Sequence, residues 1–324
     1  MNTVLIAGGS GFVGTNLVKR FLKLGYEVCV LIEQDASLWR LADMMFSINV
    51  RRADFSDFKA IRDIVEDVRP DIVINATSYG RLAHERVSKK IYDVTYLGGT
   101  NLLCACIKVG FDAFVSVGSS EEYGIVEGKI NENIVPKPVT DYGVAKAMLT
   151  TFSLRFAHCQ DLPIYCVRPF SIYGDFTPKD RLVGSLFVAA NKGVPVILRS
   201  PENIRDFLYI DDLVDVLMLI CQRKPKGANL FNVGTGVGHT VADVVSKVKN
   251  ALGIKIDTKW GGDFAEQIKP KERVADSTLA KEVLSWKPQY SLDQGIVATK
   301  DWFDRNSALY WSEDNMREIL SSVL

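Results

Sequence analysis

A tyrosine and a lysine four positions apart are the residues of this sequence best suited to proton transfer. Tyr142 and Lys146 stand in the segment DYGVAK, where the apolar spacing predicts a helix over Tyr142–His158. Side chains four residues apart lie on one face of a helix, so the Lys146 ammonium should lie beside the Tyr142 phenol. A neighbouring positive charge favours phenolate. We therefore expect Lys146 to lower the pKa of Tyr142 and to let it exchange a proton near neutral pH.

A glycine-rich turn near the N-terminus is the second chemical feature. Gly8, Gly11 and Gly14 directly follow a predicted strand and open a predicted helix. The first glycine permits the tight turn, the second lets the backbone approach a pyrophosphate, and the third lets helix and strand pack closely. Amides near Phe12 and Val13 then face phosphates at the positive end of the helix. The pattern predicts a dinucleotide site.

Residues after the second and third predicted strands bear on the choice of dinucleotide. Glu33, after the second strand, can accept hydrogen bonds from the adenosine ribose of NAD and repel the extra phosphate of NADP. Arg40 can instead pair with such a phosphate. Asp54, after the third strand, is placed to reach the adenine edge. We expect NAD or NADP, with NAD the favoured of the two.

Short β-rich runs alternate with longer amphipathic segments, which predicts an α/β fold with a doubly wound parallel sheet. The predicted strands are Thr3–Ala7, Glu27–Leu31, Ile72–Asn75, Ala113–Val117, Ile164–Ile172 and Leu230–Val233. The predicted helices are Gly14–Leu24, Phe58–Val68, Ile91–Val109, Tyr142–His158 and Val241–Leu252, and Arg205–Leu219 is predicted as a strand and a helix. Residues 1–174, with about 203–233, should form the Rossmann-like dinucleotide domain. Residues of about 175–202 and 234–324 should form a smaller C-terminal lid for the substrate.

Composition excludes several classes of protein. Lys plus Arg and Asp plus Glu both total 39, so the chain has no global positive field to attract nucleic acid or an anionic membrane. No apolar run is long enough to cross a membrane, and the N-terminal apolar run is typical of a strand rather than a signal peptide. The six cysteines lack metal-ligand spacing. We expect a cytoplasmic protein with reduced thiols and no metal site.

The order of several motifs resembles a known superfamily. GGSGFVG, SSEEYG, YGVAK, RPFSIYG and RDFLYIDD, between Val4 and about Pro288, are similar to the extended short-chain dehydrogenases/reductases that process nucleotide sugars. The resemblance implies a catalytic triad of Ser119, Tyr142 and Lys146, with Lys146 also bonding the nicotinamide ribose. Glu121 occupies the position where 4,6-dehydratases and decarboxylases carry a base. The resemblance further implies cofactor contacts at Phe55, Ala76 and Thr77, and substrate contacts at Tyr79, Ser120, Ser171, Arg205, Lys269 and Arg273.

Partial matches indicate the reaction within this superfamily. NATSYG resembles CDP-abequose and CDP-paratose synthases, SSEEYG resembles GDP-6-deoxy-D-mannose reductases, and Phe231–Val244 is similar to both. These matches imply NAD(P)H-dependent reduction of the C4 keto group of a nucleotide-linked 4-keto-6-deoxy sugar. Such a reaction would supply a deoxysugar precursor of surface polysaccharide or glycan. The alternatives are a nucleotide-sugar 4-epimerase or 4,6-dehydratase with tightly bound NAD, and a non-catalytic dinucleotide-sensing protein.

Two positions near the presumed substrate site depart from the pattern of the superfamily. Ser171 stands where relatives commonly carry Asn, and Asp175 stands where relatives continue with Pro-Gly. Arg205 remains the firmer phosphate ligand, because a guanidinium binds phosphate bidentately. The alternative for Arg205 is an ion pair with Asp206 or Asp211.

The resemblance also implies a homodimer. Members of the superfamily commonly pair their two long helices, here Ile91–Val109 and Tyr142–His158, into a four-helix bundle. Leu97, Leu149 and Phe152 could supply its apolar seam, although packing in the core is an equal use for them.

Overall fold

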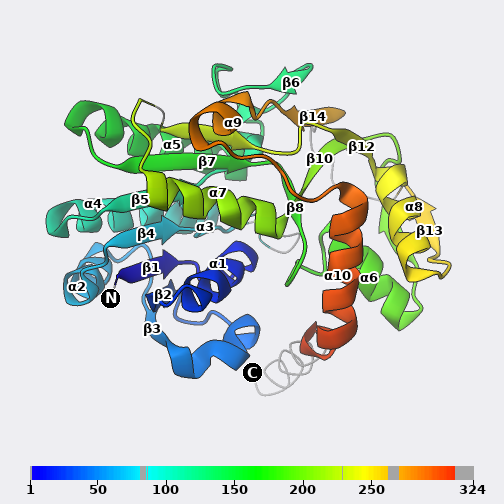
Figure 1. Ribbon diagram of the computed structural model, residues 1–324, viewed down its shortest axis with the longest axis horizontal. Coiled ribbons are helices and arrows are strands. Elements are labelled where there is room, and N and C mark those ends of the chain that lie inside the picture. Colours follow the sequence, from blue (N-terminus) through cyan, green and yellow to red (C-terminus); the bar gives the residue numbers. More distant parts are fainter. Residues whose placement is uncertain (1, 81–84, 86, 228, 262–269, 311–324) are drawn as a thin grey trace.

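A parallel sheet of seven strands runs through the centre of the larger part of the molecule (Figure 1). The computed structural model describes residues 2–80, 85, 87–227, 229–261 and 270–310. The strand order is β11-β7-β5-β4-β1-β2-β3. The strands are β1 (Thr3–Ala7), β2 (Glu27–Ile32), β3 (Ile48–Arg52), β4 (Ile72–Asn75), β5 (Ala113–Val117), β7 (Ile164–Pro169) and β11 (Leu230–Val233). The predicted α/β fold is confirmed.

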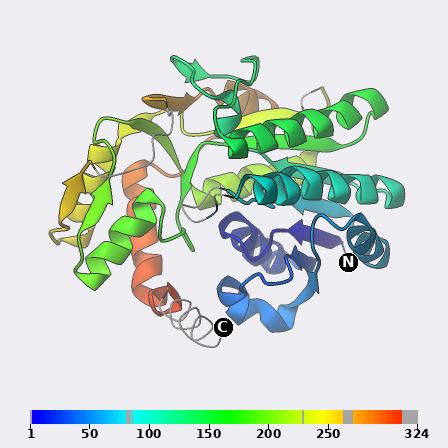
Figure 2. The same ribbon diagram turned by 180° about the vertical axis from the view of Figure 1, so that it is seen from behind.

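Helices cover both faces of this sheet, because its strands are apolar on both faces. Val4 and Ile6 of β1 belong to one buried cluster, and Leu5 and Ala7 belong to another on the opposite face. Helices α1 (Phe12–Lys23) and α7 (Ile210–Arg223) pack together on the first face. Helices α2 (Phe58–Val68), α4 (Gly98–Val109) and α5 (Asp141–Gln160) cover the second, and Figure 2 shows α4 and α5 side by side.

A smaller body lies beyond the carboxyl ends of the central strands (Figure 1). Its main sheet has the order β12-β10-β14-β6, with β8 also paired to β10. Its strands are β6 (Lys129–Ile130), β8 (Ser171–Tyr173), β10 (Ile204–Tyr209), β12 (Gly238–Thr240) and β14 (Glu272–Ala275), and β9 (Val196–Leu198) pairs separately with β13 (Thr258–Trp260). Its helices are α6 (Leu182–Lys192), α8 (Val241–Leu252) and α10 (Leu292–Asn306), whereas α9 (Thr278–Leu284) packs against α7 and β11 of the larger part.

Two predicted elements are divided in the structure. The predicted strand Ile164–Ile172 is β7 followed by β8, which belong to different sheets. The chain changes sheet at Phe170, whose side chain is buried with Tyr123 and Ile130 while its amide donates to the Val233 carbonyl (3.0 Å).

The predicted helix Ile91–Val109 is α3 (Ser88–Ile91), a π-helical turn over Tyr92–Leu97, and then α4. Within the π-helical turn the Thr95 hydroxyl contacts the Tyr79 amide (3.2 Å) and carbonyl (3.3 Å). These contacts stabilise a local departure from α-helical geometry that the apolar spacing does not encode.

Leu149 cannot contribute to an outer seam between subunits. It is 1% exposed and packs inside the chain against Gly99, where an added Cβ would lie 2.6 Å from the Leu149 Cδ2. Leu97 is 39% exposed, so it remains available on the outer surface. Among the described residues no helix is long and apolar enough to span a membrane, and no cluster of His, Cys, Asp and Glu suits a metal ion.

Asp206 of β10 joins three segments of the smaller body. Its buried carboxylate accepts hydrogen bonds from the Thr235 amide (2.8 Å) and hydroxyl (2.6 Å), the Gly236 amide (2.8 Å) and the Ala275 amide (3.1 Å). Burial raises the pKa of Asp206, and these four donors act against that rise. The carboxylate therefore fixes β14 and the loop after β11 against β10.

Replacing Asp206 by alanine should destabilise the protein strongly. Asp206→Ala leaves three backbone amides without their acceptor, and each buried unsatisfied group costs about 1–3 kcal/mol. We expect the free energy of unfolding to fall by ~3–5 kcal/mol, measured by urea denaturation. Asp304→Ala, which removes an exposed ion pair with Lys300, is the control and should cost under ~1 kcal/mol. Equal losses in the two variants would contradict the anchoring role.

Candidate active site

A cavity of about 500 Å³ opens at the carboxyl ends of the central strands. Its wall includes Ile32, Val117 and Pro169, the last residues of β2, β5 and β7. Ligands bind at this edge in open α/β sheets, because the loops that leave the strands meet there. The cavity also reaches β10 and β14 of the smaller body through Arg205 and Arg273.

The glycine-rich turn forms one wall of the cavity. Gly8 has φ +76°, and an added Cβ would lie 2.8 Å from the Ala76 carbonyl, so only glycine fits there. A Cβ on Gly14 would lie 2.3 Å from the Gly8 carbonyl oxygen. Helix α1 begins at Phe12, two residues before the predicted start, and Phe12 and Val13 both line the cavity. The positive end of α1 is therefore at the site predicted for phosphates.

The residues predicted to select the dinucleotide lie in different surroundings. Glu33 lines the cavity and accepts a long hydrogen bond from the Phe55 amide (3.5 Å), and burial raises the pKa of its carboxyl. Arg40 also lines the cavity, with its guanidinium 4.2 Å from the centre of the Trp39 ring. Asp54 is exposed, next to Phe55 of the cavity wall, and its carboxylate accepts hydrogen bonds from the amide and hydroxyl of Ser56 (2.7 and 2.6 Å). Its contact with the adenine edge stays a prediction.

Tyr142 and Lys146 of α5 both line the cavity, together with Ser119. The Lys146 ammonium is fully buried and donates to the carbonyls of Thr77 (2.9 Å) and Val117 (2.6 Å). Burial lowers the pKa of Lys146 to about 8, although the nearby Glu122 carboxylate acts in the opposite direction. The structure thus brings the three predicted triad residues to one cavity wall.

Sequence reasoning missed Glu122. One carboxylate oxygen accepts the Ser119 amide (2.8 Å), and the other pairs with the Arg168 guanidinium (2.7 Å); neither charged side chain is more than 3% exposed. The Arg168 guanidinium also lies 4.5 Å from the centre of the Tyr123 ring. Ser119 and Glu122 form a capping box for the short 3₁₀ helix Ser120–Tyr123, and the serine-x-x-glutamate spacing was the signal that could have identified it.

Glu121 lies on the cavity side of the same short helix. Its carboxylate accepts the Thr140 hydroxyl (3.3 Å) and lies 3.9 Å from the Arg273 guanidinium. Ser120 is buried in the cavity wall beside it. The two neighbouring acids therefore differ. Glu122 is buried and accepts a hydrogen bond from the Ser119 amide, whereas Glu121 lines the cavity.

Two arginines from adjacent strands reach the same cavity. Arg205 and Arg273 are register partners on β10 and β14, and both line the wall. Arg205 donates to the carbonyls of Lys271 and Pro270 (both 3.0 Å), and Arg273 donates to the Gly124 carbonyl (3.0 Å). Such a pair of guanidinium groups favours an anion between them.

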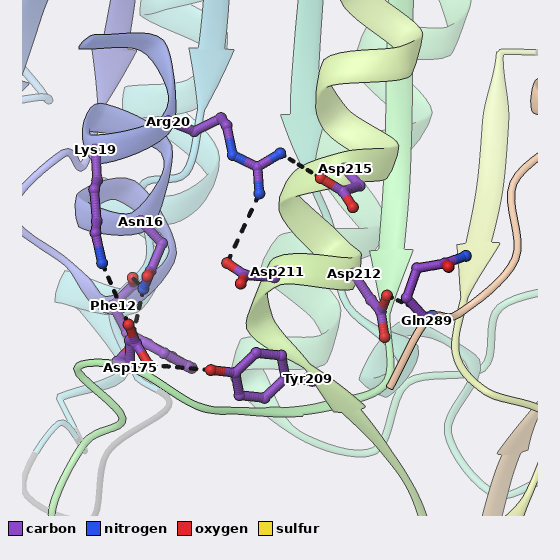
Figure 3. Close-up of polar contacts among 10 residues, drawn as sticks. All are labelled: Phe12, Asn16, Lys19, Arg20, Asp175, Tyr209, Asp211, Asp212, Asp215 and Gln289. Carbon is purple, nitrogen blue, oxygen red and sulfur yellow. Dashed lines mark hydrogen bonds and ion pairs between the residues drawn. The ribbon is translucent and has the colours of Figure 1, made fainter. Parts of the chain in front are cut away.

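The alternative of an ion pair between Arg205 and Asp206 or Asp211 is wrong. Asp206 binds backbone amides, and Asp211 lies 3.9 Å from Arg20 (Figure 3).

Ala76, Thr77, Tyr79 and Ser171 complete the predicted set at the wall. Tyr79 packs in the same cluster as Tyr142. Ser171, Arg181 and Arg205 also border a second cavity of about 370 Å³ in the smaller body, so the two cavities are neighbours. Lys269, predicted to bind substrate, lies outside the described residues.

This fold and this site define a dinucleotide-dependent enzyme of the extended short-chain dehydrogenase/reductase class. The chain belongs to the NAD dependent epimerase/dehydratase family, which it matches over residues 4–234. The prediction of a nicotinamide dinucleotide, with NAD favoured, is thereby confirmed.

Known relatives indicate the kind of chemistry. The chain is 27% identical to a UDP-glucose 4-epimerase of Lactobacillus helveticus (91% of this chain, 95% of that protein). It is 24% identical to a dTDP-glucose 4,6-dehydratase of Xanthomonas campestris pv. campestris (94% of both chains). The solved structure of MoeE5 in complex with UDP-glucose and NAD is similar, with a TM-score of 0.84, 26% identity and coverage of 94% of this chain and 99% of that chain. These relatives fit the 4-epimerase and 4,6-dehydratase alternatives more than the predicted 4-ketoreduction.

The buried Lys146 ammonium should make the stability of the protein depend on pH. Its pKa falls from 10.5 to about 8 on folding, so its full destabilising effect is present below pH 8 and is relieved as the pH rises from about 8 to 10.5. A shift of this size corresponds to ~3 kcal/mol. We expect the free energy of unfolding of the natural protein, relative to Lys146→Met, to rise over that interval in denaturant titrations. A difference that stays constant with pH would refute the burial of a charged ammonium.

Proposed function

We propose that the protein uses NAD to oxidise C4 of a nucleoside diphosphate hexose and completes the reaction without net consumption of dinucleotide. This is the chemistry of a nucleotide-sugar 4-epimerase or 4,6-dehydratase. The observation that carries the proposal is a single cavity whose wall holds the glycine-rich turn, the Tyr142 and Lys146 pair, and the register-paired Arg205 and Arg273. The identities of the relatives support the redox-neutral form of the reaction.

In this mechanism Tyr142 removes the proton of the C4 hydroxyl as C4 becomes a ketone. NAD, when bound, supplies the hydride acceptor and later the hydride donor. The Lys146 ammonium favours the phenolate form of Tyr142, and Ser119 donates a hydrogen bond to the oxygen on C4. Return of the hydride to the other face of C4, with a proton from Tyr142, gives the 4-epimer. Removal of the C5 proton with loss of the C6 hydroxyl as water, followed by addition of the hydride at C6 and return of a proton to C5, would instead give a 4-keto-6-deoxy sugar.

The cavity wall offers suitable groups for both ligands. Amides at Phe12 and Val13 would hold the pyrophosphate of NAD, and Glu33 would accept its adenosine ribose hydroxyls. Arg205 and Arg273 would hold the diphosphate of the substrate, whose hexose then faces Tyr142. Tyr79, Ser120 and Ser171 are proposed as the remaining hexose contacts. The predicted substrate domain, about 175–202 with 234–324, would carry the nucleotide.

Glu121 distinguishes the two redox-neutral reactions. Dehydration requires removal of the C5 proton, and a carboxylate in the cavity wall is a suitable base for that step. Epimerisation at C4 requires no such base. Glu121→Gln should therefore stop a dehydratase while leaving a 4-epimerase largely active.

The second candidate is the 4-ketoreduction of a nucleotide-linked 4-keto-6-deoxy sugar. It is favoured by the NATSYG and SSEEYG segments, which resemble reductases. A dinucleotide sensor without activity fits less well, because Ser119, Tyr142 and Lys146 are all present at the cavity. We also propose that the protein is a cytoplasmic homodimer, in which α4 and α5 of the two subunits pair. Its proposed role is in deoxysugar or polysaccharide synthesis.

Glu33 should set the preference for NAD over NADP. Glu33→Ala removes a charge that repels the 2′-phosphate, which is worth on the order of 1 kcal/mol, so the preference for NAD should relax several-fold. The measurement is the Kd of each dinucleotide by isothermal titration calorimetry. Asp63→Ala is the matched control, because Asp63 is an exposed acid of α2 that pairs with Arg62 and does not line the cavity. Tighter binding of NADP than of NAD by the natural protein would show that Glu33 has another role.

The decisive experiment follows products and dinucleotide together. The purified protein is denatured to release and quantify any NAD, and is then incubated with UDP-glucose or dTDP-glucose. Products are identified by mass spectrometry and NMR while absorbance at the NADH wavelength is recorded. We expect an isomer, or a product lighter by one water, with no net change in NADH. Stoichiometric oxidation of NADH or NADPH by a 4-keto-6-deoxy sugar nucleotide would instead establish the reductase.

Tyr142→Phe tests the mechanism in the same assay. It keeps the ring and its packing but removes the proton carrier, so turnover should fall by roughly 10²- to 10⁴-fold. Ser119→Ala, which removes only a supporting hydrogen bond, should have the smaller effect. Near-normal turnover by Tyr142→Phe, with NAD still bound, would show that Tyr142 serves only packing.

A further inference from the structure

Asp175 lies two residues after β8, in the loop of residues 174–181 that joins β8 to α6 and that we call the crossover. This is the position at which the sequence departs from the Pro-Gly of its relatives. In Figure 3 the residue faces α1, the helix that begins at the glycine-rich turn. Its backbone carbonyl accepts a hydrogen bond from the Asn16 side chain (3.0 Å), and the same amide group donates to the Phe12 carbonyl (2.9 Å). The crossover is therefore tied to the first turn of α1.

The Asp175 carboxylate adds two contacts of unequal weight. One oxygen lies 3.4 Å from the Lys19 ammonium, but that lysine is 58% exposed, so the ion pair contributes little. The other accepts the hydroxyl of Tyr209 (3.1 Å), a residue only 4% exposed at the end of β10. A buried hydroxyl that loses its acceptor costs about 1–3 kcal/mol, so the Tyr209 hydrogen bond is the stronger constraint.

The next residue anchors the crossover to a second part of the dinucleotide wall. Phe176 has φ +63°, a conformation that a side chain other than glycine adopts only when its surroundings impose it. Its ring packs on Trp302 (4.7 Å between centres) and lies near Trp39 (6.3 Å). Its carbonyl accepts a hydrogen bond from Arg40 (3.3 Å). The crossover is therefore held against two segments that line the predicted cofactor site: Asp175 contacts α1, and Phe176 contacts Trp39 and Arg40.

The crossover then leads directly to the substrate side of the cavity. Pro178 and Arg181 line the main cavity, and Arg181 also borders the second cavity and directly precedes α6. A ligand that fixes the first turn of α1 is thus connected, through Asn16 and Asp175, to residues that would contact the other ligand. Coupling between sites requires such a contiguous structural link.

We propose that Asp175 is a positioning residue that couples dinucleotide binding at α1 to nucleotide-sugar binding beyond the crossover. The proposal rests on the proposed function, because it takes NAD and a nucleoside diphosphate sugar as the two ligands. With Asp175 in place, NAD binding orders α1 and the crossover together. Part of the conformational entropy of Arg181 is then lost before the sugar nucleotide binds, so that the second ligand binds more tightly.

The experiment measures the coupling factor, which is the ratio of the Kd of UDP without NAD to its Kd with saturating NAD. Isothermal titration calorimetry on the full chain, with dTDP as a second probe, supplies both constants. In the natural protein we expect NAD to tighten nucleoside diphosphate binding by at least about fivefold. Asn16→Ala removes the side chain that joins α1 to the Asp175 carbonyl, and Asp175→Ala releases the crossover from Tyr209. In each variant the factor should fall below about twofold, with circular dichroism checking that the variant is folded. Asp175→Asn keeps an acceptor for Tyr209 and should retain most of the coupling.

Asp215→Asn is the matched control. Asp215 of α7 pairs with Arg20 of α1, so its substitution loosens the same helix without touching the crossover (Figure 3). This variant should keep the coupling factor of the natural protein.

Unchanged coupling in Asp175→Ala, an equal loss in Asp215→Asn, or a natural protein that binds both ligands independently would each overturn the proposal. Failure of the natural protein to bind NAD or either nucleoside diphosphate is a separate result, which rejects the proposed function and this inference with it.

Discussion

Burying an ammonium group costs free energy unless its donors and its charge are compensated, and this requirement organises the candidate site around Lys146. The carbonyls of Thr77 and Val117, at the ends of two adjacent strands, accept its hydrogen bonds. The Glu122 carboxylate supplies the compensating field, and it is itself buried and paired with Arg168. The same carboxylate accepts a hydrogen bond from the Ser119 amide, so the position of Ser119, the predicted triad serine, depends on the group that compensates the lysine charge.

The sequence predicted the central sheet well because its strands are short, apolar and separated by amphipathic helices. Thr3–Ala7, Ile72–Asn75, Ala113–Val117 and Leu230–Val233 have the predicted bounds in the structure. Local pattern could not reveal that Phe170 divides one apolar run between two sheets, because the packing that draws its ring away comes from β6 and β14. Helix α10 was missed for a similar reason, since much of what stabilises it is distant in sequence, such as its packing on α8.

In the candidate site, too, the contacts between residues close in sequence could be predicted, and those between residues distant in sequence could not. Tyr142 and Lys146 could be predicted because one helical turn brings them together, and the glycines because their turn is local. The hydrogen bonds of the Asp54 carboxylate to Ser56 are also local, but the sequence position alone did not indicate them. The register of Arg205 with Arg273 depends on the pairing of β10 with β14, which no sequence spacing specifies.

The π-helical turn at Tyr92–Leu97 has a consequence for how this chain can accept length changes. A π-helical turn holds more residues than an α-helical turn, so it amounts to one residue inserted into a continuous helix. Deleting a single residue there would restore regular α-helical winding with little rotation of α3 relative to α4, because the wider turn already accommodates the extra residue. Thr95 lies within this turn, so its contact with Tyr79 is the one that the deletion would disturb. A one-residue deletion in this segment should therefore alter the cavity wall at Tyr79 while α3 and α4 keep their packing, whereas the same deletion in an exposed loop would be absorbed.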